Sequence, residues 1–302
     1  MERWRLQQKQ SLPLEQKVQL TQFKIRKWYE HWGGGVSVSF SGGKDSTVLL
    51  DLVRSQYPSI PAVFANTGQE YADIIRFIKS FGNIAWVKPK MTFWDVVEKH
   101  GWPVISKKVS MGLARYRNTK SQLQRDLRIN GGICPTSGKA QYRTIPIKWQ
   151  FLLKAPFKCS DICCDILKKR PLKKYAKETG RRTMLATMAD ESTIRTVQYL
   201  KTGCNAFDSN TPISTPMAFW TEEDIWAYIK SRDLPYSDIY NKGERRTGCK
   251  YCIFGAHMEK EPNRFQRMRK NFPGQFANFE RHGGCNVLDF IGIPHREPNL
   301  LF

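Results

Sequence analysis

The chain has 302 residues, of which 40% are hydrophobic and 12% aromatic, so it can build a sizeable core and is too apolar to be disordered. No run approaches the roughly 18 apolar residues of a membrane span, and polar and basic residues follow Met1, so we expect a cytoplasmic protein without a membrane partner. Lys and Arg number 49 against 27 Asp and Glu. A net charge of +22 favours a polyanionic partner such as nucleic acid, although a basic surface without a specific ligand would carry the same charge.

The N-terminal third of the chain alternates between helix and strand patterns. Apolar residues at helical spacing predict an amphipathic helix over residues 14–32. Strands are predicted over residues 36–40, 61–65 and 84–87, and they are followed by helices from Thr47, over 70–81 and over 93–100. This alternation is typical of βαβ units, so we expect an α/β protein with a doubly wound, mostly parallel sheet.

The middle of the chain is strongly basic. Residues 101–182 hold 20 Lys and Arg but only 4 Asp and Glu, and residues 107–143 lack a clear periodicity, so we expect an insertion or a mobile loop there. Four aromatic residues of this tract could stack on unpaired bases or lie in the core: Tyr116, Tyr142, Trp149 and Phe157. Later elements are predicted over 147–153 and 162–176 (helices), over 183–188 (a strand) and from the helix cap Thr221.

The first predicted strand is followed by the loop Ser41-Gly42-Gly43-Lys44-Asp45-Ser46 and then by a helix. Glycines let the backbone approach a ligand closely, and successive amides at a helix N-terminus attract a phosphate group. The two serine hydroxyls can add hydrogen bonds, and Lys44 adds a full positive charge. The Gly-Lys-Ser/Thr ending of the usual Walker loop is absent, and a polar glycine turn without a ligand is the alternative.

This loop resembles the signature of the PP-loop ATP pyrophosphatase superfamily, whose members bind an adenine nucleotide and commonly activate a substrate as an adenylate. Ala189-Asp190-Glu191-Ser192 with Arg195 resembles the Arg-x-Asp/Glu-Ser-x-x-Arg element of the phosphoadenosine phosphosulfate (PAPS) reductase family. Residues 219–226 and 234–236 resemble that family's W-T-E-x-D-V-W and L-P-Y segments. Without a ligand, Asp190 or Ser192 would simply cap a helix and Arg195 would pair with Glu191.

The resemblance implies an adenine-nucleotide fold of the α-hydrolase type that binds ATP, or alternatively PAPS or its unphosphorylated relative APS. It implies Lys44, Asp45 and Arg195 as catalytic residues, with Mg²⁺ positioned by Asp45 and with Arg195 near the α-phosphate. Further nucleotide contacts are expected from the loop residues Ser41, Gly42, Gly43 and Ser46 and from Asn66, Thr67, Asp190, Glu191 and Ser192. Asn66 stands where relatives often have Asp.

These motifs suggest a division of the chain into three parts. We expect an N-terminal helical segment over residues 1–34 and a nucleotide-binding domain over 35–245. The basic tract at about 107–145 is expected to be an insertion in that domain. A small basic subdomain with a Cys-x-x-Cys motif is expected over 246–302.

Two cysteine pairs, Cys163-Cys164 and Cys249-x-x-Cys252, are separated by 84 residues. They resemble the [4Fe–4S] ligands of the iron–sulfur branch of this family. Four thiolates would also suit tetrahedral Zn²⁺, and thiols without a metal are the third possibility. Cys159 lies one helical turn before Cys163 and could replace Cys164. No role is expected for three other cysteines: Cys134, Cys204 and Cys285.

Departures from the family pattern guide the choice of reaction. Sulfonucleotide reductases carry a C-terminal Glu-Cys-Gly-Leu/Ile-His element, which the sequence around Cys285 does not match, and the complete loop resembles that of ATP-hydrolysing members. We therefore expect an enzyme of the ATP pyrophosphatase or sulfurtransferase type that activates and thiolates a nucleic acid (tRNA or DNA) or a nucleotide, with a sulfur donor protein. The alternatives are a thioredoxin-dependent PAPS or APS reductase and a nucleic-acid-binding accessory protein with a structural metal.

Overall fold

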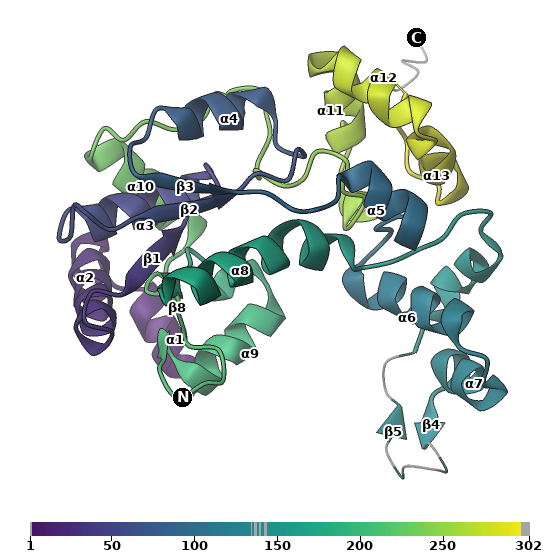
Figure 1. The fold of residues 1–302 in the computed structure, drawn as a ribbon, viewed down its shortest axis with the longest axis horizontal. Coiled ribbons are helices and arrows are strands. Elements are labelled where there is room, and N and C mark those ends of the chain that lie inside the picture. Colours follow the sequence, from purple (N-terminus) through teal and green to yellow (C-terminus); the bar gives the residue numbers. More distant parts are fainter. Residues whose placement is uncertain (1, 134, 136–137, 139, 142–143, 297–302) are drawn as a thin grey trace. The chain divides into compact units, whose positions relative to one another are not determined.

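The structure is a computed structural model that describes residues 2–133, 135, 138, 140–141 and 144–296 (Figure 1). The chain divides into two compact units. The first unit comprises Met1–Asn66, Glu70–Lys88 and Arg170–Thr247, and the second comprises Thr67–Gln69, Pro89–Lys169 and Gly248–Phe302. In this division the basic tract forms one unit with the C-terminal residues, and the three-part division expected from the sequence stays a prediction.

A sheet forms the centre of the first unit. Its described strands lie in the order β3-β2-β1-β6-β8-β7. Their bounds are β1 (Val36–Ser39), β2 (Ala62–Ala65), β3 (Ile84–Val87), β6 (Arg182–Met184), β7 (Asn205–Ala206) and β8 (Ile213–Ser214). All neighbours pair in parallel except β7, which runs antiparallel to β8 at the edge. The predicted mostly parallel sheet is confirmed, although the strand predicted over 183–188 already ends at Met184.

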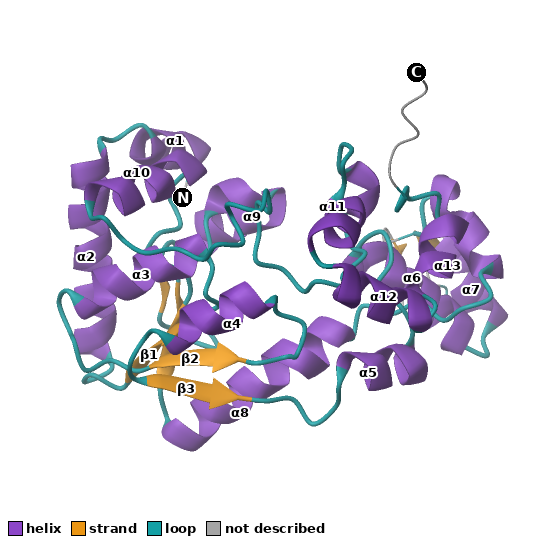
Figure 2. Cartoon of the chain, turned by 90° about the horizontal axis from the view of Figure 1, so that it is seen from above, coloured by secondary structure: helices purple, strands orange, loops and turns teal. Residues whose placement is uncertain are grey.

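Helices cover this sheet on both sides. They are α1 (Arg3–Gln10), α2 (Leu14–His31), α3 (Lys44–Arg54), α4 (Ala72–Lys79), α8 (Arg170–Thr179), the 3₁₀ turn η3 (Ala189–Glu191), α9 (Thr193–Thr202) and α10 (Glu222–Ser231). Helix α3 packs against β1, α2 and α10, whereas α8 packs against β2 and β3. Figure 2 shows α4 and α8 on opposite sides of the strands, as expected for a doubly wound sheet.

The second unit is mainly helical. Its elements are α5 (Phe93–His100), α6 (Lys107–Asn118), α7 (Gln122–Asn130), the hairpin of β4 (Gly132–Ile133) and β5 (Ala140–Gln141), the 3₁₀ helix η1 (Ile147–Lys154), the π-helix η2 (Asp165–Lys169), the 3₁₀ turn η4 (Ala256–Met258), α11 (Arg264–Asn271), α12 (Pro273–Arg281) and α13 (Gly284–Phe290). Its core joins side chains from both ends of the unit's sequence, including Phe93, Trp102, Phe265 and Phe279.

The expectation of an irregular loop over 107–143 is wrong for residues 107–130. Ser106 and Ser121 cap two helices there, and each helix buries a leucine, Leu113 in α6 and Leu127 in α7. The many Lys and Arg side chains around these leucines concealed the helical period in the sequence. Cys134 and Tyr142 lie outside the described residues. Within the described ranges, no helix is both long and apolar enough to cross a membrane.

Candidate functional site

The predicted phosphate loop connects β1 to α3 in the first unit. Gly42 has a φ of +71°, and a Cβ atom on it would lie 2.7 Å from Cγ1 of Ile78. A Cβ atom on Gly43 would lie 2.4 Å from the hydroxyl oxygen of Thr247. Both positions therefore require glycine, the first for its backbone conformation and both for space. The sequence places a tightly enclosed bend at the N-terminus of α3, where a phosphate group binds favourably.

The two serines of the loop hold it closed. The Ser46 hydroxyl accepts a hydrogen bond from the Ser41 amide at 3.2 Å and donates one to the Gly43 carbonyl at 2.9 Å. The Ser41 hydroxyl lies 3.2 Å from the Ser46 hydroxyl. Thr47 adds a further hydroxyl bond of 3.1 Å to the Gly43 carbonyl. These bonds preorganise the loop before any ligand binds.

Lys44, the first residue of α3, has a buried side chain with two acidic neighbours. Its ammonium group lies 3.1 Å from a carboxylate oxygen of Asp45 and 3.2 Å from one of Glu222, the first residue of α10. Burial lowers the pKa of Lys44, but the two carboxylates outweigh it and raise the pKa above its ordinary value. The side chain is therefore a fixed positive charge at neutral pH, directly beside the loop.

Asp45 combines a basic and an acidic neighbourhood. Burial raises the pKa of its carboxyl group, Lys44 lowers it, and the nearby Glu191 and Glu222 raise it further, so that the net shift is upward. Carboxylate oxygens are the protein ligands that Mg²⁺ prefers, and Asp45 has two further carboxyl groups in its surroundings. Asp45 is thus in a suitable environment for the expected Mg²⁺.

Tyr240 is a member of the site that the sequence did not single out. Its hydroxyl oxygen accepts a hydrogen bond of 2.8 Å from the amide of Lys44. It thereby occupies an acceptor position that a phosphate oxygen would take at this helix N-terminus. Tyr240 packs edge-on against Trp226 and Tyr236, at 5.5 and 6.3 Å between ring centroids. The only signal in the sequence is its place four residues after the Leu-Pro-Tyr segment.

The predicted residues around η3 lie partly at the loop. Glu191 interacts with Asp45 and forms an ion pair with Arg195. The Ser192 hydroxyl caps α9 by accepting a bond of 3.4 Å from the Arg195 amide. The ion pair of Arg195 with Glu191 and the helix cap by Ser192 are the contacts expected for this segment if it binds no ligand. The segment is therefore ordered by its own interactions. Asp190 is exposed.

Asn66 and Thr67 follow β2 but belong to different units. Asn66 is in the first unit, where its amide donates a bond of 2.9 Å to the carbonyl of Val87. Thr67 belongs to the second unit and is buried, and its hydroxyl oxygen accepts a bond of 3.1 Å from the Gln69 amide. The expected nucleotide contact of Thr67 therefore remains a prediction.

The four predicted metal ligands all lie in the second unit. Cys163 forms a hydrogen bond with Cys164 and interacts electrostatically with Cys252 and Cys249. Cys249 and Cys252 are joined by a turn in which the Cys252 amide donates a hydrogen bond of 3.1 Å to the Cys249 carbonyl. The fold therefore brings together two pairs that are far apart in sequence. Cys159 instead pairs through its backbone with Trp102, and burial raises its pKa to about 11.

Positive side chains surround this cysteine cluster, defined as Cys163, Cys164, Cys249 and Cys252. The hydrogen bond from Cys163 is the main cause that lowers the pKa of Cys164 below its ordinary value, burial opposes it, and three lysines contribute to the lowering: Lys107, Lys168 and Lys169. The last two belong to η2, which begins directly after Cys164. A π-helix often marks a functional site, and here it brings lysines close to a thiolate.

The donor set fits a cluster in kind and number. Four thiols from two segments suit an iron–sulfur cluster or Zn²⁺, and the lysines would offset the negative charge of the bound form. In the described part of the chain, no three His, Cys, Asp or Glu side chains are arranged to hold a metal ion as they stand. The fit therefore rests on the type and convergence of the thiols.

Comparisons with known proteins agree with the expected family. An uncharacterized protein of Methanocaldococcus jannaschii is 26% identical over 262 residues, which are 83% of this chain and 49% of that protein. The adenosine 5'-phosphosulfate reductase of Halalkalibacterium halodurans is 25% identical over 235 residues, 76% of this chain and 78% of the enzyme. The chain spans about half the length of the M. jannaschii proteins that it matches.

Among solved structures, the U34-tRNA thiolase NcsA of Methanococcus maripaludis with its [4Fe-4S] cluster is similar over 95% of this chain and 84% of its own. Its TM-score of 0.39 and identity of 15% are too low to assign chemistry. The family assignment comes from a sequence model, the phosphoadenosine phosphosulfate reductase domain, which matches residues 35–111 and 115–254. Since these residues make up more than half of the chain, the chain belongs to the phosphoadenosine phosphosulfate reductase domain family.

Proposed function

We propose that this protein uses ATP to activate an oxygen of a nucleic acid or nucleotide and then replaces that oxygen with sulfur. The observation that carries the proposal is the complete phosphate loop, preorganised by Ser41 and Ser46 around a buried, positively charged Lys44. A loop of this kind stabilises the charge that develops on departing pyrophosphate. A reaction that only reduces a sulfonucleotide releases no pyrophosphate and has less need of it.

Each side chain of the loop has a role in this scheme. The Lys44 ammonium group would face the β- and γ-phosphates of ATP, since it lies beside the N-terminus of α3. Asp45 would hold Mg²⁺, which would neutralise part of the negative charge of the phosphates. Arg195, whose side chain is 41% exposed, would leave Glu191 and approach the α-phosphate where the substrate oxygen attacks.

The cysteine cluster would hold a [4Fe–4S] group through Cys163, Cys164, Cys249 and Cys252. Such a group supplies an iron site that binds and delivers inorganic sulfur. The residues of this chain contribute the thiolates and the positive field of Lys107, Lys168 and Lys169, which favours a bound sulfur anion. A sulfur donor protein is the expected source of the sulfur. Zn²⁺ in place of iron would instead support a structural role.

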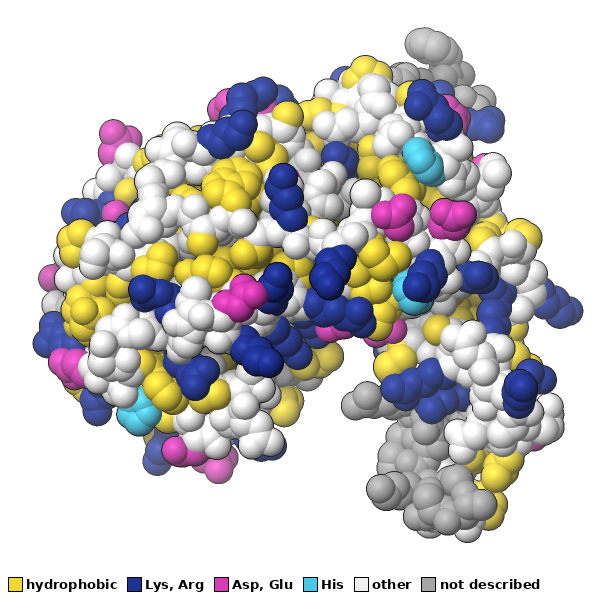
Figure 3. Space-filling view, viewed as in Figure 1, with side chains coloured by type: hydrophobic (Ala, Val, Ile, Leu, Met, Phe, Trp, Pro, Cys, Tyr) yellow, Lys and Arg dark blue, Asp and Glu magenta, His cyan; other side chains and the backbone are white. Residues whose placement is uncertain are grey.

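A polyanionic substrate agrees with the charge of the chain. The second unit contains 24 Lys and Arg against 10 Asp and Glu, whereas the first contains 25 against 17. Figure 3 shows Lys and Arg side chains spread over one face of the molecule. Because the unit with the cysteine cluster has the larger positive excess, we propose that the nucleic acid binds to it.

The properties of Cys285 favour thiolation over sulfonucleotide reduction. Reductases of this family use a nucleophilic cysteine in the C-terminal part of the chain. Here the candidate Cys285 is only 7% exposed within α13, and burial raises its pKa to about 11. A protonated, buried thiol is a poor nucleophile at neutral pH.

The test is ATP–pyrophosphate exchange by the anaerobically purified protein, with bulk tRNA and sheared DNA supplied in separate reactions. We expect exchange in one of the two, and a decrease of about 100-fold in Lys44→Ala. The matched control is Lys79→Ala, an exposed lysine at the end of α4 in the same unit, which should exchange normally. Equal activity of Lys44→Ala and the control would remove the loop from catalysis.

A second candidate function is thioredoxin-dependent reduction of APS or PAPS. The 25% identity with an adenosine 5'-phosphosulfate reductase over 76% of this chain favours it. If the protein is such a reductase, it releases sulfite from the sulfonucleotide, and the Cys285→Ser variant releases none. Sulfite formation without pyrophosphate exchange would replace the first proposal with this one.

A further inference from the structure

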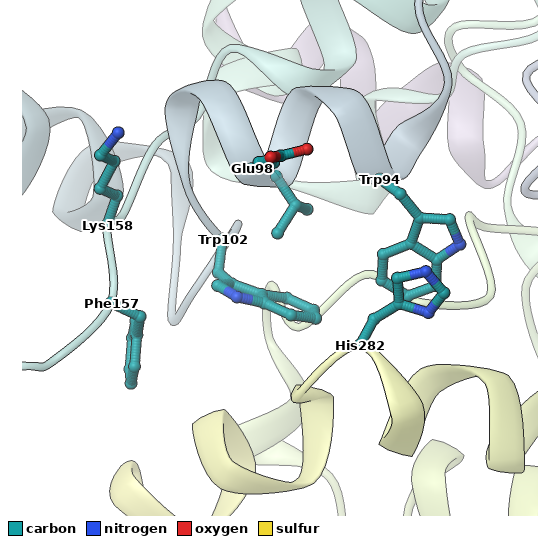
Figure 4. A pocket seen from close by; sticks show the side chains of 7 residues that line it. Trp94, Glu98, Trp102, Phe157, Lys158 and His282 are labelled. Atoms are coloured by element: carbon teal, nitrogen blue, oxygen red, sulfur yellow. The ribbon is translucent and has the colours of Figure 1, made fainter.

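A cavity of about 500 Å³ opens in the second unit and takes no part in the site described above. Figure 4 shows the stacked rings of Trp94 and His282 on one side, Trp102 at the base, Phe157 and Lys158 on the opposite side and Glu98 above. The cavity thus combines aromatic walls with one basic and one acidic side chain. This is the usual composition of a site that binds a flat heterocycle by stacking and hydrogen bonds.

The walls of this cavity are fixed by backbone bonds. The Trp102 amide donates to the Lys158 carbonyl at 2.8 Å, and the Ser160 amide donates to the Trp102 carbonyl at 2.9 Å. Gly101 makes this approach possible, because a Cβ atom there would lie 2.3 Å from the Lys158 carbonyl carbon. The φ of Gly101 is +106°, which other residues rarely adopt. The segments that carry Trp102 and Phe157 are therefore held side by side.

The aromatic rings are also preorganised. His282 stacks on Trp94 with 3.9 Å between centroids and 4° between planes. Trp102 is buried and meets Trp94 and Phe279 edge-on, at 6.0 and 5.7 Å. His282 is exposed, so the stacked pair borders the cavity with a ring that can be reached from solvent. Rigid aromatic walls bind a planar ligand at little entropic cost.

Aromatic rings continue from the cavity along the surface of this unit. The ring centroids of Phe157 and Phe290 are 5.4 Å apart, and those of Phe290 and Phe151 are 5.8 Å apart. The centroids of Phe151 and Trp149 are 6.1 Å apart. Phe151 and Phe290 are 42% and 36% exposed. Three exposed lysines are interleaved with these rings in the sequence: Lys148, Lys154 and Lys158. Alternating aromatic and basic side chains are characteristic of surfaces that bind single-stranded nucleic acid.

We infer that the cavity accepts one unstacked base of a single-stranded nucleic-acid segment, and that the neighbouring aromatic residues and lysines bind the nucleotides beside it. Glu98 can accept a hydrogen bond from the ring N–H of thymine or uracil or from the exocyclic amino group of another base, and Lys158 can donate one to a base oxygen or a phosphate. A small cationic ligand fits less well, because the cavity is larger than one ammonium group and the unit is strongly basic.

The cavity is connected to the cysteine cluster through one side chain. Tyr251 lies between Cys249 and Cys252 in sequence, and its ring is 4.9 Å from that of Trp94. A base held in the cavity would thus be bound by the unit that also carries the cluster. The inference deepens the proposed function by naming the recognised group, and it rests on that function only for the idea that the bound nucleic acid is modified.

The test compares two single strands of equal charge and length, about ten nucleotides each. One is oligo(dT), and the other is a chain of the same number of abasic sugar phosphates. Fluorescence anisotropy measures their binding without ATP, and oligo(U) provides an RNA arm. We expect the base-bearing strand to bind about tenfold more tightly than the abasic strand, since stacking is the term that differs.

Two variants then test the cavity itself. His282→Ala and Phe157→Ala should each bind the two strands with nearly equal affinity. The matched control is His31→Ala, which removes an exposed histidine that packs against Trp32 and Phe207 in the first unit, and it should retain the preference. Glu98→Gln changes an exposed side chain and should reduce the preference without affecting folding, which circular dichroism checks.

The inference is overturned if the native protein binds both strands equally, or if both cavity variants keep the full preference. Lys44→Ala should retain the preference, because no nucleotide is needed for binding. Failure of pyrophosphate exchange together with an intact base preference would reject the proposed function and leave the base site standing.

Discussion

The Tyr240 hydroxyl occupies the backbone amide of Lys44, which the proposed nucleotide would also have to contact. The two residues are 196 positions apart, and the bond length is 2.8 Å. A phosphate at the start of α3 has to replace this bond, and the exchange costs part of its own binding energy. If the loop binds ATP as proposed, the hydroxyl lowers the affinity of the loop for ATP while it keeps the empty loop in shape.

Tyr240→Phe should consequently bind ATP about three- to tenfold more tightly, which corresponds to the net contribution of one hydrogen bond. Isothermal titration calorimetry measures this change. Tyr236→Phe is the matched control, since Tyr236 packs near Tyr240 and is 40% exposed. Weaker ATP binding by Tyr240→Phe would instead mean that the hydroxyl contacts the nucleotide.

Gly42 shows how strongly one position of the loop is constrained. Alanine at this position has to adopt a φ of +71°, and its Cβ would lie 2.7 Å from Ile78. We expect Gly42→Ala to lower the free energy of unfolding by about 2–4 kcal/mol, from the strained backbone and the steric overlap together. Urea denaturation tests this, with Gly82→Ala as the control because a Cβ at Gly82 meets no atom within 4 Å. A loss no larger than that of the control would contradict the prediction.

At the scale of elements, most contiguous patterns of the first unit were predictable from the sequence, whereas most contacts between distant residues were not. The strand, the glycine loop and the start of α3 are contiguous, so their order was predictable from the sequence. The predicted helix cap at Thr221 is likewise local and is confirmed, and Asp224 completes a capping box with it. Helices α6 and α7 were missed because basic side chains hide their few buried leucines. No local pattern could reveal that Tyr240 contacts Lys44 or that Trp102 pairs with Cys159.

Arg264, the first residue of α11, forms an ion pair with Glu259 and a hydrogen bond with the backbone of Cys252. The Glu259 carboxylate accepts hydrogen bonds of 2.8 Å from the Arg264 amide and of 2.7 Å from the Arg264 Nε atom. Another guanidinium nitrogen of Arg264 donates a hydrogen bond of 3.0 Å to the Cys252 carbonyl. Burial raises the pKa of Glu259, but the hydrogen bonds from Arg264 outweigh it and hold the pKa below its ordinary value. The ionised carboxylate therefore stabilises both the helix and the Cys252 turn.

A carboxyl group whose pKa is lower in the folded than in the unfolded protein stabilises the folded state. This stabilisation is fully present above the pKa of the unfolded protein, about 4.5, and is lost as the pH falls through the pKa of the folded protein. Glu259→Gln should therefore be about 1–2 kcal/mol less stable than the native protein near neutral pH. The difference should disappear in acid, below both pKa values. Urea denaturation at several pH values measures it, with the exposed Glu280→Gln as the control. A difference that does not depend on pH would contradict the role of the charge.

At the scale of the whole molecule, the positive charge is divided unequally between the two units. The second unit has a formal excess of +14 and the first of +8. Each phosphate neutralised by a lysine or arginine releases counterions. The logarithm of the binding constant for a single strand therefore falls by about 0.7 per phosphate contact for each tenfold increase in salt concentration. The slope of this dependence counts the phosphate contacts, and it separates them from stacking, which is much less sensitive to salt.

If the nucleic acid follows the aromatic residues of the second unit, removing the lysines among them should reduce that slope. Replacement of Lys148, Lys154 and Lys158 by Gln should lower it by about 2, because up to three phosphate contacts are lost. The control replaces three exposed lysines of the first unit, Lys79, Lys201 and Lys230, and removes the same charge. Anisotropy titrations of oligo(dT) at a series of salt concentrations compare the two variants. Equal slopes would mean that net charge alone attracts the nucleic acid, whereas a decrease confined to the first triple variant would locate the strand on the second unit.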